Sequence, residues 1–145
     1  MSELKKKLSV LKIKKLVSNI KGINDVLLFT DKPAVINWYS GQLDHLDNNI
    51  PCICRFSSNI DIKYLSEYIE MLAGGVRHFI IIFWDFLPVY VSFKIESFYD
   101  FLKSFYSELH TKDITLFFLN EEKVLDIFLS EYELEVRILG NNAKN

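Results

Sequence analysis

The sequence has little cysteine, proline or glycine: two, three and five residues in a chain of 145. Cys52 and Cys54 stand one residue apart, and side chains at that spacing in an extended segment point to opposite faces. A disulfide framework is therefore excluded, and we expect a cytoplasmic protein with reduced cysteines. The longest apolar run, "FIIIFWDFLPVYV", is interrupted by Asp85 and Pro88 and is too short for a transmembrane segment. The start of the chain also lacks the pattern of a secretory signal peptide.

Short motifs that carry common chemistry are lacking as well. Gly74 and Gly75 stand in neither the GxxxxGK[ST] nor the GxGxxG pattern, and this pair is typical of a helix end. The adjacent acids Glu121 and Glu122 would diverge on a helix, so one acid–base site cannot use both. The segment "DHLD" (44–47) falls short of the three or more convergent ligands of a metal site, and we interpret it as a solvated loop. We predict no metal site, no cofactor and no catalytic residue.

Cysteine, histidine and one acid remain as isolated candidates for chemistry. Cys52 and Cys54 have no second pair of ligands in the sequence, so we interpret them as buried structural residues. His78 and Asp85 stand at the two ends of an apolar segment, where they are expected to solvate the ends of a strand. A cysteine–histidine couple with His78 or His110 cannot be inferred from the sequence. We therefore expect a protein that is not an enzyme.

Apolar residues make up half of the chain and charged residues a quarter, with 12 Phe and 7 Tyr. This length and composition predict one globular domain over residues 1–145, with a frayed basic tail at 1–8 and a disordered tail at 140–145. Charge is divided unevenly, because residues 1–24 carry a net +6 and residues 25–145 a net −8. The basic segment contains seven lysines: Lys5, Lys6, Lys7, Lys12, Lys14, Lys15 and Lys21.

Hydrophobic periodicity predicts a helix from the cap Ser9 to the stop at Gly22, then a strand at 25–30. Residues 34–40 favour a second strand in a hairpin, with a helix from Pro33 as the competing interpretation. Residues 40–49 read as a polar loop, and 50–56 as either a strand or the start of a helix. The remaining predicted elements are a helix from Ser58 to Gly74, strands at 77–85 and 88–95, a helix at 98–110 capped by Ser97, a strand at 113–119, a helix at 121–132 capped by Asn120, and a strand at 133–139.

The predicted order is α-β-β-α-β-β-α-β-α-β, which indicates an α+β fold with a mainly antiparallel sheet of hairpins flanked by helices. In the hairpin strand 88–95 we expect Val89, Val91, Phe93 and Ile95 to point inward, and the alternate residues Tyr90, Ser92 and Lys94 to point outward.

Residues 9–95 resemble the Roadblock/dynein light chain family of the profilin-like and longin-like group. The resemblance depends on the segments "KGINDVLLFTD", "LLFTDKPAVINWYS", "EYIEMLAGG" and "HFIIIFWDFLPVYVSFKI". It implies a non-enzymatic homodimer that serves as a platform or regulator for small GTPases or motors. It also implies a dimer seam that includes Leu65, Tyr68, Ile69 and the strand 77–85.

Two other interpretations stay open. A looser similarity to small bacterial immunity proteins implies an inhibitor that neutralises a basic toxin domain through acidic residues near the carboxyl end. These residues are Glu121, Glu122, Asp126, Glu131, Glu133 and Glu135. The lysines between Lys5 and Lys21 could instead contact nucleic acid or a membrane surface. A solvated helix face is the simpler interpretation of those lysines, and we expect no nucleic-acid partner.

Overall fold

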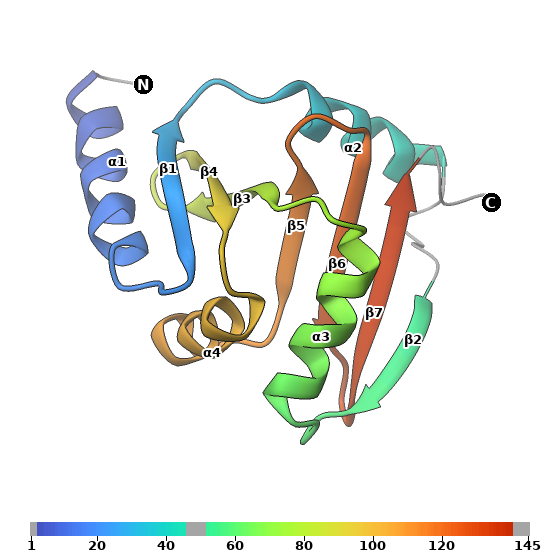
Figure 1. Ribbon diagram of the computed structural model, residues 1–145. Coiled ribbons are helices and arrows are strands. Elements are labelled where there is room, and N and C mark those ends of the chain that lie inside the picture. Colours follow the sequence, from blue (N-terminus) through green and yellow to red (C-terminus); the bar gives the residue numbers. More distant parts are fainter. Residues whose placement is uncertain (1–2, 46–51, 141–145) are drawn as a thin grey trace.

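The computed structural model describes residues 3–45 and 52–140, which contain four helices and seven strands (Figure 1). In chain order these are α1 (Glu3–Val17), β1 (Ile23–Phe29), α2 (Ala34–His45), β2 (Cys52–Ser57), α3 (Ile62–Ala73), β3 (His78–Trp84), β4 (Pro88–Ile95), α4 (Phe98–Leu109), β5 (Ile114–Phe118), β6 (Lys123–Leu129) and β7 (Glu133–Gly140). The predicted α+β class is confirmed, while the predicted order of elements holds only in part.

All seven strands form one antiparallel sheet in the order β1-β4-β3-β5-β6-β7-β2. The predicted hairpin of β3 and β4 is confirmed, with pairs from His78 and Lys94 to Trp84 and Pro88. The chain leaves β1 at one edge, passes through α2 and returns as β2 at the opposite edge. The sequence left residues 50–56 between strand and helix, and their described part, from Cys52 onward, belongs to the edge strand β2.

Helices cover both faces of the sheet. Helices α1, α3 and α4 pack on one face, where the main core includes the fully buried Leu65, Ile69 and Phe101. Helix α2 packs on the other face over a smaller core that includes Ile80 and Tyr90. The prediction that Tyr90 and Ser92 point to solvent is therefore wrong, because both are buried on the second face.

Residues 34–40 are the first part of helix α2, so the predicted second strand is wrong and the competing helix is correct. Main-chain N–H groups of Ile36 and Asn37 donate to the carbonyl of Pro33, which starts the first turn. The helix places Val35 and Ile36 against the sheet, where both are buried. This burial outweighs the β propensity of the segment, since tertiary packing regularly overrides local propensity. Residues 41–45 of the predicted polar loop are also helical, and residues 46–51 lie outside the described part of the chain.

Residues 123–129 form strand β6, so the predicted helix at 121–132 is wrong. The strand pairs with β5 on one side and β7 on the other. Leu125 and Ile127 face the main core while Val124 faces the smaller one, a period-two pattern that fits a strand buried on both faces. The acids that suggested a helix start lie in the turn before it, where Lys123 N–H donates to the carbonyl of Glu121.

The ends of three helices differ in how well they were predicted. Helix α1 begins at Glu3, so the predictions that Ser9 caps it and that residues 3–8 fray are wrong, and Ser9 lies buried within it. Helix α3 is capped by Asp61, whose carboxylate accepts from Lys63 N–H, rather than by Ser58. The cap of α4 by Ser97 is confirmed. In the described residues no helix is both long and apolar enough to cross a bilayer.

Candidate functional site

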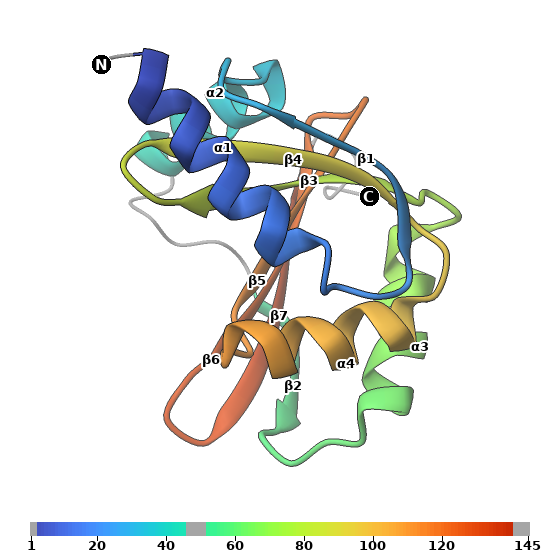
Figure 2. The ribbon, with the colours of Figure 1, turned by 90° about the vertical axis from the view of Figure 1, so that its left-hand side faces the viewer.

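The sheet divides between β3 and β5. These neighbouring strands pair at only two positions, Phe79 with Phe118 and Ile80 with Phe117, whereas β3 pairs with β4 along its whole length. Figure 2 shows that the sheet twists strongly at this point. Strands β3 and β4 run across the view, whereas β5, β6 and β7 cross their direction at a steep angle. Beyond Ile80 the strands separate around a cleft of about 490 Å³, which we call the β3–β5 cleft.

Main-chain groups of both strands face this cleft. The carbonyl of His78 accepts from Leu119 N–H, so the two-residue period of a strand also turns Ile80, Ile82 and Trp84 toward β5. The register that joins Ile80 to Phe117 would join Ile82 to Thr115 next, but among the described residues no strand pairs with Ile82 or Trp84 on this side. In the cleft, β3 therefore has an unpaired strand edge, although β3 lies in the interior of the sheet and not at its outer edge.

Apolar side chains from both helix layers line the β3–β5 cleft. Phe105 and Leu109 come from α4, and Tyr39 comes from α2. The Tyr39 ring packs edge-on against Phe117, with ring centroids 5.2 Å apart. Trp84 also lines the cleft, with 73% of its surface exposed. Apolar walls, an exposed aromatic ring and a volume within the range of about 300–1,000 Å³ are typical of a ligand site.

A polar row lies next to the cleft on the face that α2 covers. Thr115, Asp126 and Arg137 stand opposite one another on β5, β6 and β7, and Cys52 follows on β2. Thr115 Oγ1 donates to Asp126 Oδ1 at 2.7 Å. We call Thr115, Asp126 and Arg137 the polar row.

Burial raises the pKa of Asp126 above its ordinary value, and the nearby carboxylate of Asp113 adds to that rise. The hydrogen bond from Thr115 and the charge of Arg137 act in the opposite direction. Burial also raises the pKa of Tyr39, with a second contribution from Asp126. The polar row therefore places beside the cleft one carboxylate whose charged form is disfavoured by burial. This carboxylate can accept a hydrogen bond or bind a cation.

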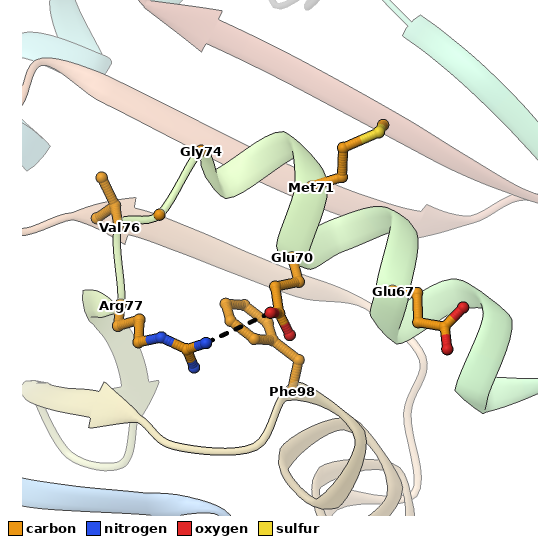
Figure 3. Close-up of a pocket in the computed structure, with 8 residues that line it drawn as sticks. Glu67, Glu70, Met71, Gly74, Val76, Arg77 and Phe98 are labelled. Atoms are coloured by element: carbon orange, nitrogen blue, oxygen red, sulfur yellow. Dashed lines mark hydrogen bonds and ion pairs between the residues drawn. The ribbon is translucent and has the colours of Figure 1, made fainter.

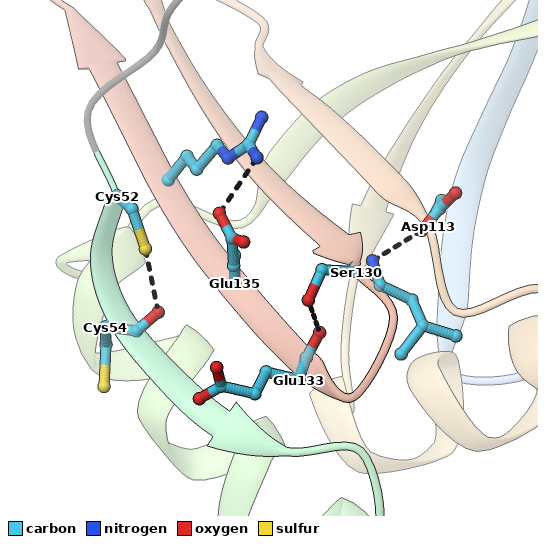
Figure 4. Close-up of polar contacts among 8 residues, drawn as sticks. Cys52, Cys54, Asp113, Ser130, Glu133 and Glu135 are labelled. Atoms are coloured by element: carbon cyan, nitrogen blue, oxygen red, sulfur yellow. Dashed lines mark hydrogen bonds and ion pairs between the residues drawn. The ribbon is translucent and has the colours of Figure 1, made fainter.

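Arg137 already has several neighbours. Its Nη2 donates to Glu135 Oε1 at 2.9 Å, and its guanidinium carbon lies 4.8 Å from the centroid of the Phe128 ring. Figure 4 shows Glu135 on β7 together with the cysteines of the adjacent edge strand. In the described part of the chain Arg137 Nε is buried without a hydrogen-bond partner.

A second depression of about 390 Å³ lies at the end of α3 (Figure 3). Arg77 crosses it, with Nη2 3.3 Å from Glu70 Oε2 and Nη1 3.1 Å from the carbonyl oxygen of Ile95. The guanidinium also lies over the Phe98 ring at 5.7 Å. Because these contacts join α3, β4 and α4, we assign Arg77 a structural role.

The residues of the implied dimer seam are not all on the surface. Leu65 and Ile69 are fully buried in the core of their own chain, so a second copy has no access to them. Tyr68 is half-buried and packs edge-on against Phe56 of β2. Of strand 77–85, only the ends are exposed, at His78 and Trp84.

The six acidic residues predicted to face a toxin do not form one surface. Glu121 and Glu122 lie in the turn before β6, whereas Glu131 and Glu133 lie at the turn after it, seven strand residues away. Figure 4 shows Glu133 at that second turn, where its main-chain carbonyl accepts from the Ser130 hydroxyl. Glu135 and Asp126 are half-buried on the sheet.

Six of the seven predicted basic residues lie on α1 and Lys21 follows it. Lys6 is half-buried and the other six are exposed. Lys12 Nζ lies 3.3 Å from Asp85 Oδ1, and Asp85 also accepts from Ser9. Asp85 thus holds α1 against the β3–β4 turn. Its position at the end of a strand did not predict this contact with the helix.

The isolated candidates for chemistry lie apart. His78 and Asp85 stand at opposite ends of β3, and three strands separate β3 from the edge strand with Cys52 and Cys54. Both cysteines are free and half-buried. The described residues contain no group of three His, Cys, Asp or Glu that could hold a metal ion. The side chains of Asp44, His45 and Asp47 lie outside the described residues.

Sequence reasoning missed Tyr39, Trp84, Thr115 and Arg137 as members of a site, and it placed Asp126 on a helix. The alternation in "KVLDIFL" was the available signal, because it predicts a strand with Asp126 on the face opposite Leu125 and Ile127. The separation of β3 from β5 has no comparable local signal, since both strands read as ordinary apolar segments.

Comparisons of this chain with protein-family models, curated proteins and solved structures gave no match.

Proposed function

We propose that this protein is a non-enzymatic protein-interaction module that binds an extended segment of a partner protein in the β3–β5 cleft. The observation that carries the proposal is the unpaired edge of β3 at Ile82 and Trp84, opposite Thr115 of β5. An extended peptide can supply the missing hydrogen bonds by strand addition, a common way in which sheets recognise peptides.

The main-chain geometry favours an occupant in extended conformation. Ile82 and Trp84 each offer one N–H and one carbonyl on the same side, which is the spacing that a second strand matches. A main-chain N–H or carbonyl that is removed from water without a new hydrogen-bond partner costs free energy. A ligand that forms hydrogen bonds with these groups therefore binds more tightly than a ligand that only fills the cleft.

Side chains would provide the remaining affinity. Trp84 is exposed in the free protein and borders the cleft, so it can cover an apolar residue of the bound segment. Tyr39 and Phe105 form the apolar walls on either side of the sheet. The carboxylate of Asp113 lines the cleft and favours a partner segment with a basic residue near the Thr115 end.

A dimeric Roadblock-like platform for a small GTPase is a narrower form of this proposal. With Leu65 and Ile69 inside the core, its seam would have to use exposed residues of α3 such as Tyr64 and Met71. The two free, half-buried cysteines fit a location in the cytoplasm, which we retain as part of the proposal.

The test begins with selection of peptides from a random library on the full-length chain, followed by amide hydrogen exchange with and without the selected peptide. We expect the peptide to slow exchange at Ile82 and Trp84 more than at any amide of α3. A variant that fills the cleft, Thr111→Tyr, should weaken binding by about tenfold or more, because it occupies the volume the peptide needs.

The matched control is Ser107→Tyr, which adds the same ring at an exposed position of α4 outside the cleft. It should bind the peptide as the wild type does. Protection confined to another surface, or equal binding by the Thr111→Tyr variant, would show that the cleft is not the binding site.

A further inference from the structure

Helix α1 has apolar residues on two opposite faces. Ile13 and Val17 on the inner face are buried in the main core. On the outer face, Leu4, Leu8 and Leu11 are 66%, 50% and 61% exposed. Their spacing of four and three residues places them in one stripe along the helix. The stripe is thus at least half open to solvent, and Figures 1 and 2 show α1 along the outside of the molecule.

Lysines border the leucine stripe on both sides. At 100° per residue, Lys7 and Lys14 lie on one side of it, and Lys5 and Lys12 lie on the other. Lys15 continues the stripe itself by one turn. All five are exposed, although Lys12 also contacts Asp85. We call the three leucines and these five lysines the outer face of α1.

An aromatic residue from another element lies beside this face. Phe86, in the β3–β4 turn, is 63% exposed, and its ring centroid lies 5.9 Å from Lys5 Nζ. The hydrogen bond from Ser9 to Asp85 fixes that turn against the helix. Phe86 therefore extends the exposed apolar surface next to the amino-terminal half of α1.

We propose that the outer face of α1 binds the surface of an anionic lipid bilayer, with the helix lying in the plane of the interface. Leucines can enter the boundary between headgroups and acyl chains, while the lysine ammonium groups on both sides reach the lipid phosphates. Phe86 is suited to the same interfacial depth.

The arrangement favours a bilayer over other anionic partners. Nucleic acid would pair with the lysines but would leave the three leucines in water, so that they would contribute nothing. An acidic protein would need an apolar groove with acidic residues along both rims, whereas an anionic bilayer supplies an apolar layer beneath a charged one everywhere. This surface is separate from the β3–β5 cleft, so the inference does not depend on the proposed function.

The test is flotation of the full-length protein with vesicles of phosphatidylcholine or of equimolar phosphatidylcholine and phosphatidylglycerol. We expect binding only to the anionic vesicles, and weaker binding at high salt. Replacing Lys7, Lys14 and Lys15 with Gln should lower the partition coefficient on the order of a hundredfold, since each lysine near an anionic surface contributes about 1 kcal/mol. Replacing Leu4, Leu8 and Leu11 with Gln should lower it about tenfold or more.

Two control variants carry the same kinds of change elsewhere. One control replaces Lys32, Lys63 and Lys103 with Gln and removes an equal charge. The other replaces Ile53, Tyr99 and Tyr132 with Gln and removes exposed apolar residues. Both controls should bind within about twofold of wild type. Circular dichroism checks that every variant is folded, and the single variant Leu8→Gln replaces the triple leucine variant if that one unfolds.

Absence of binding to anionic vesicles would overturn the proposal, as would equal binding by the leucine variants. Retention on DNA without vesicle binding would overturn it in favour of nucleic acid. A dimer that only the leucine variants abolish, again without vesicle binding, would overturn it in favour of a second copy of this chain.

Discussion

The hydroxyl of Ser9 donates to Asp85 Oδ2 at 2.8 Å, which joins α1 to the β3–β4 turn across 76 positions of sequence. Ser9 is fully buried, and Lys12 contacts the other oxygen of the same carboxylate. The hydrogen bond from Ser9 is the main reason why the pKa of Asp85 lies below its ordinary value, and the Phe86 main chain and Lys12 add to this effect. This contact holds α1 against the turn, while the burial of Ile13 and Val17 in the main core turns the leucines of the outer face outward.

Replacing Ser9 with Ala should lower the thermal unfolding midpoint by a few degrees at neutral pH, because Asp85 loses its buried hydrogen-bond donor. Thermal unfolding followed by circular dichroism measures the change. The exposed Ser107→Ala on α4 is the control and should leave the midpoint unchanged.

The effect of Ser9→Ala should also depend on pH. The folded-state pKa of Asp85 is lowered, so its contribution is present above the ordinary pKa of 3.8 and is lost as pH falls through the lowered value. The difference in midpoint between wild type and Ser9→Ala should therefore shrink in acid. A difference that grows as pH falls would contradict the role given to Asp85.

Gly22 should not tolerate a side chain. Its φ is +79°, and a Cβ would lie 2.6 Å from the carbonyl oxygen of Ser97. We expect Gly22→Ala to lower the free energy of unfolding by about 2 kcal/mol or more. Gly41 in α2 is the matched control, because a Cβ there meets no atom within 4 Å, and Gly41→Ala should instead stabilise by about 0.5–1 kcal/mol. Urea unfolding measures both, and equal effects of the two would contradict this prediction.

Asp126→Asn tests the electrostatics of the polar row. Burial raises the folded-state pKa of Asp126, so the wild type loses stability as pH rises from 3.8 through the raised value. Asn can still accept the hydrogen bond from Thr115 but carries no charge. The variant should therefore gain stability relative to wild type as pH rises, as measured by urea unfolding across the pH range. The control for loss of one carboxylate is Asp31→Asn, at an exposed position after β1. If the stability gained by Asp126→Asn disappeared toward neutral pH, the prediction would be contradicted.

Trp84→Ala should separate binding from stability. With 73% of the residue exposed, its loss should change the free energy of unfolding by less than about 0.5 kcal/mol. Affinity for a selected peptide should fall about thirtyfold, the effect of losing a binding hot spot of about 2 kcal/mol. Isothermal titration calorimetry measures the affinity. Tyr132→Ala, 74% exposed in the turn before β7, is the control and should bind normally.

The fold class could be predicted because local patterns are strong in β3, β4, α3 and α4. The hydrophobic period and the cap at Ser97 agree there with the tertiary structure. Predictions failed where local and tertiary preferences differ. Val35 and Ile36 have β propensity but are buried as part of a helix, and β6 follows acids that fit a helix start equally well.

The candidate site was much less predictable than the fold. Tyr39, Trp84 and Thr115 come from three elements that meet only after β3 and β5 separate, and that separation results from the twist between two halves of the sheet. The three leucines of the outer face of α1 share one side of the helix, and the helical period alone places them together. Which side of the helix faces the sheet is set by the burial of Ile13 and Val17 in the main core, and a sequence alone does not reveal that choice.

The most direct measurement of the central claim is amide hydrogen exchange of β3 in the free protein, read residue by residue by NMR. If the edge beside β5 is open, Ile82 and Trp84 exchange much faster than Ile81 and Phe83, whose N–H groups face β4. Uniformly slow exchange across all four residues would mean that this edge is already satisfied, and that no strand is missing from the cleft.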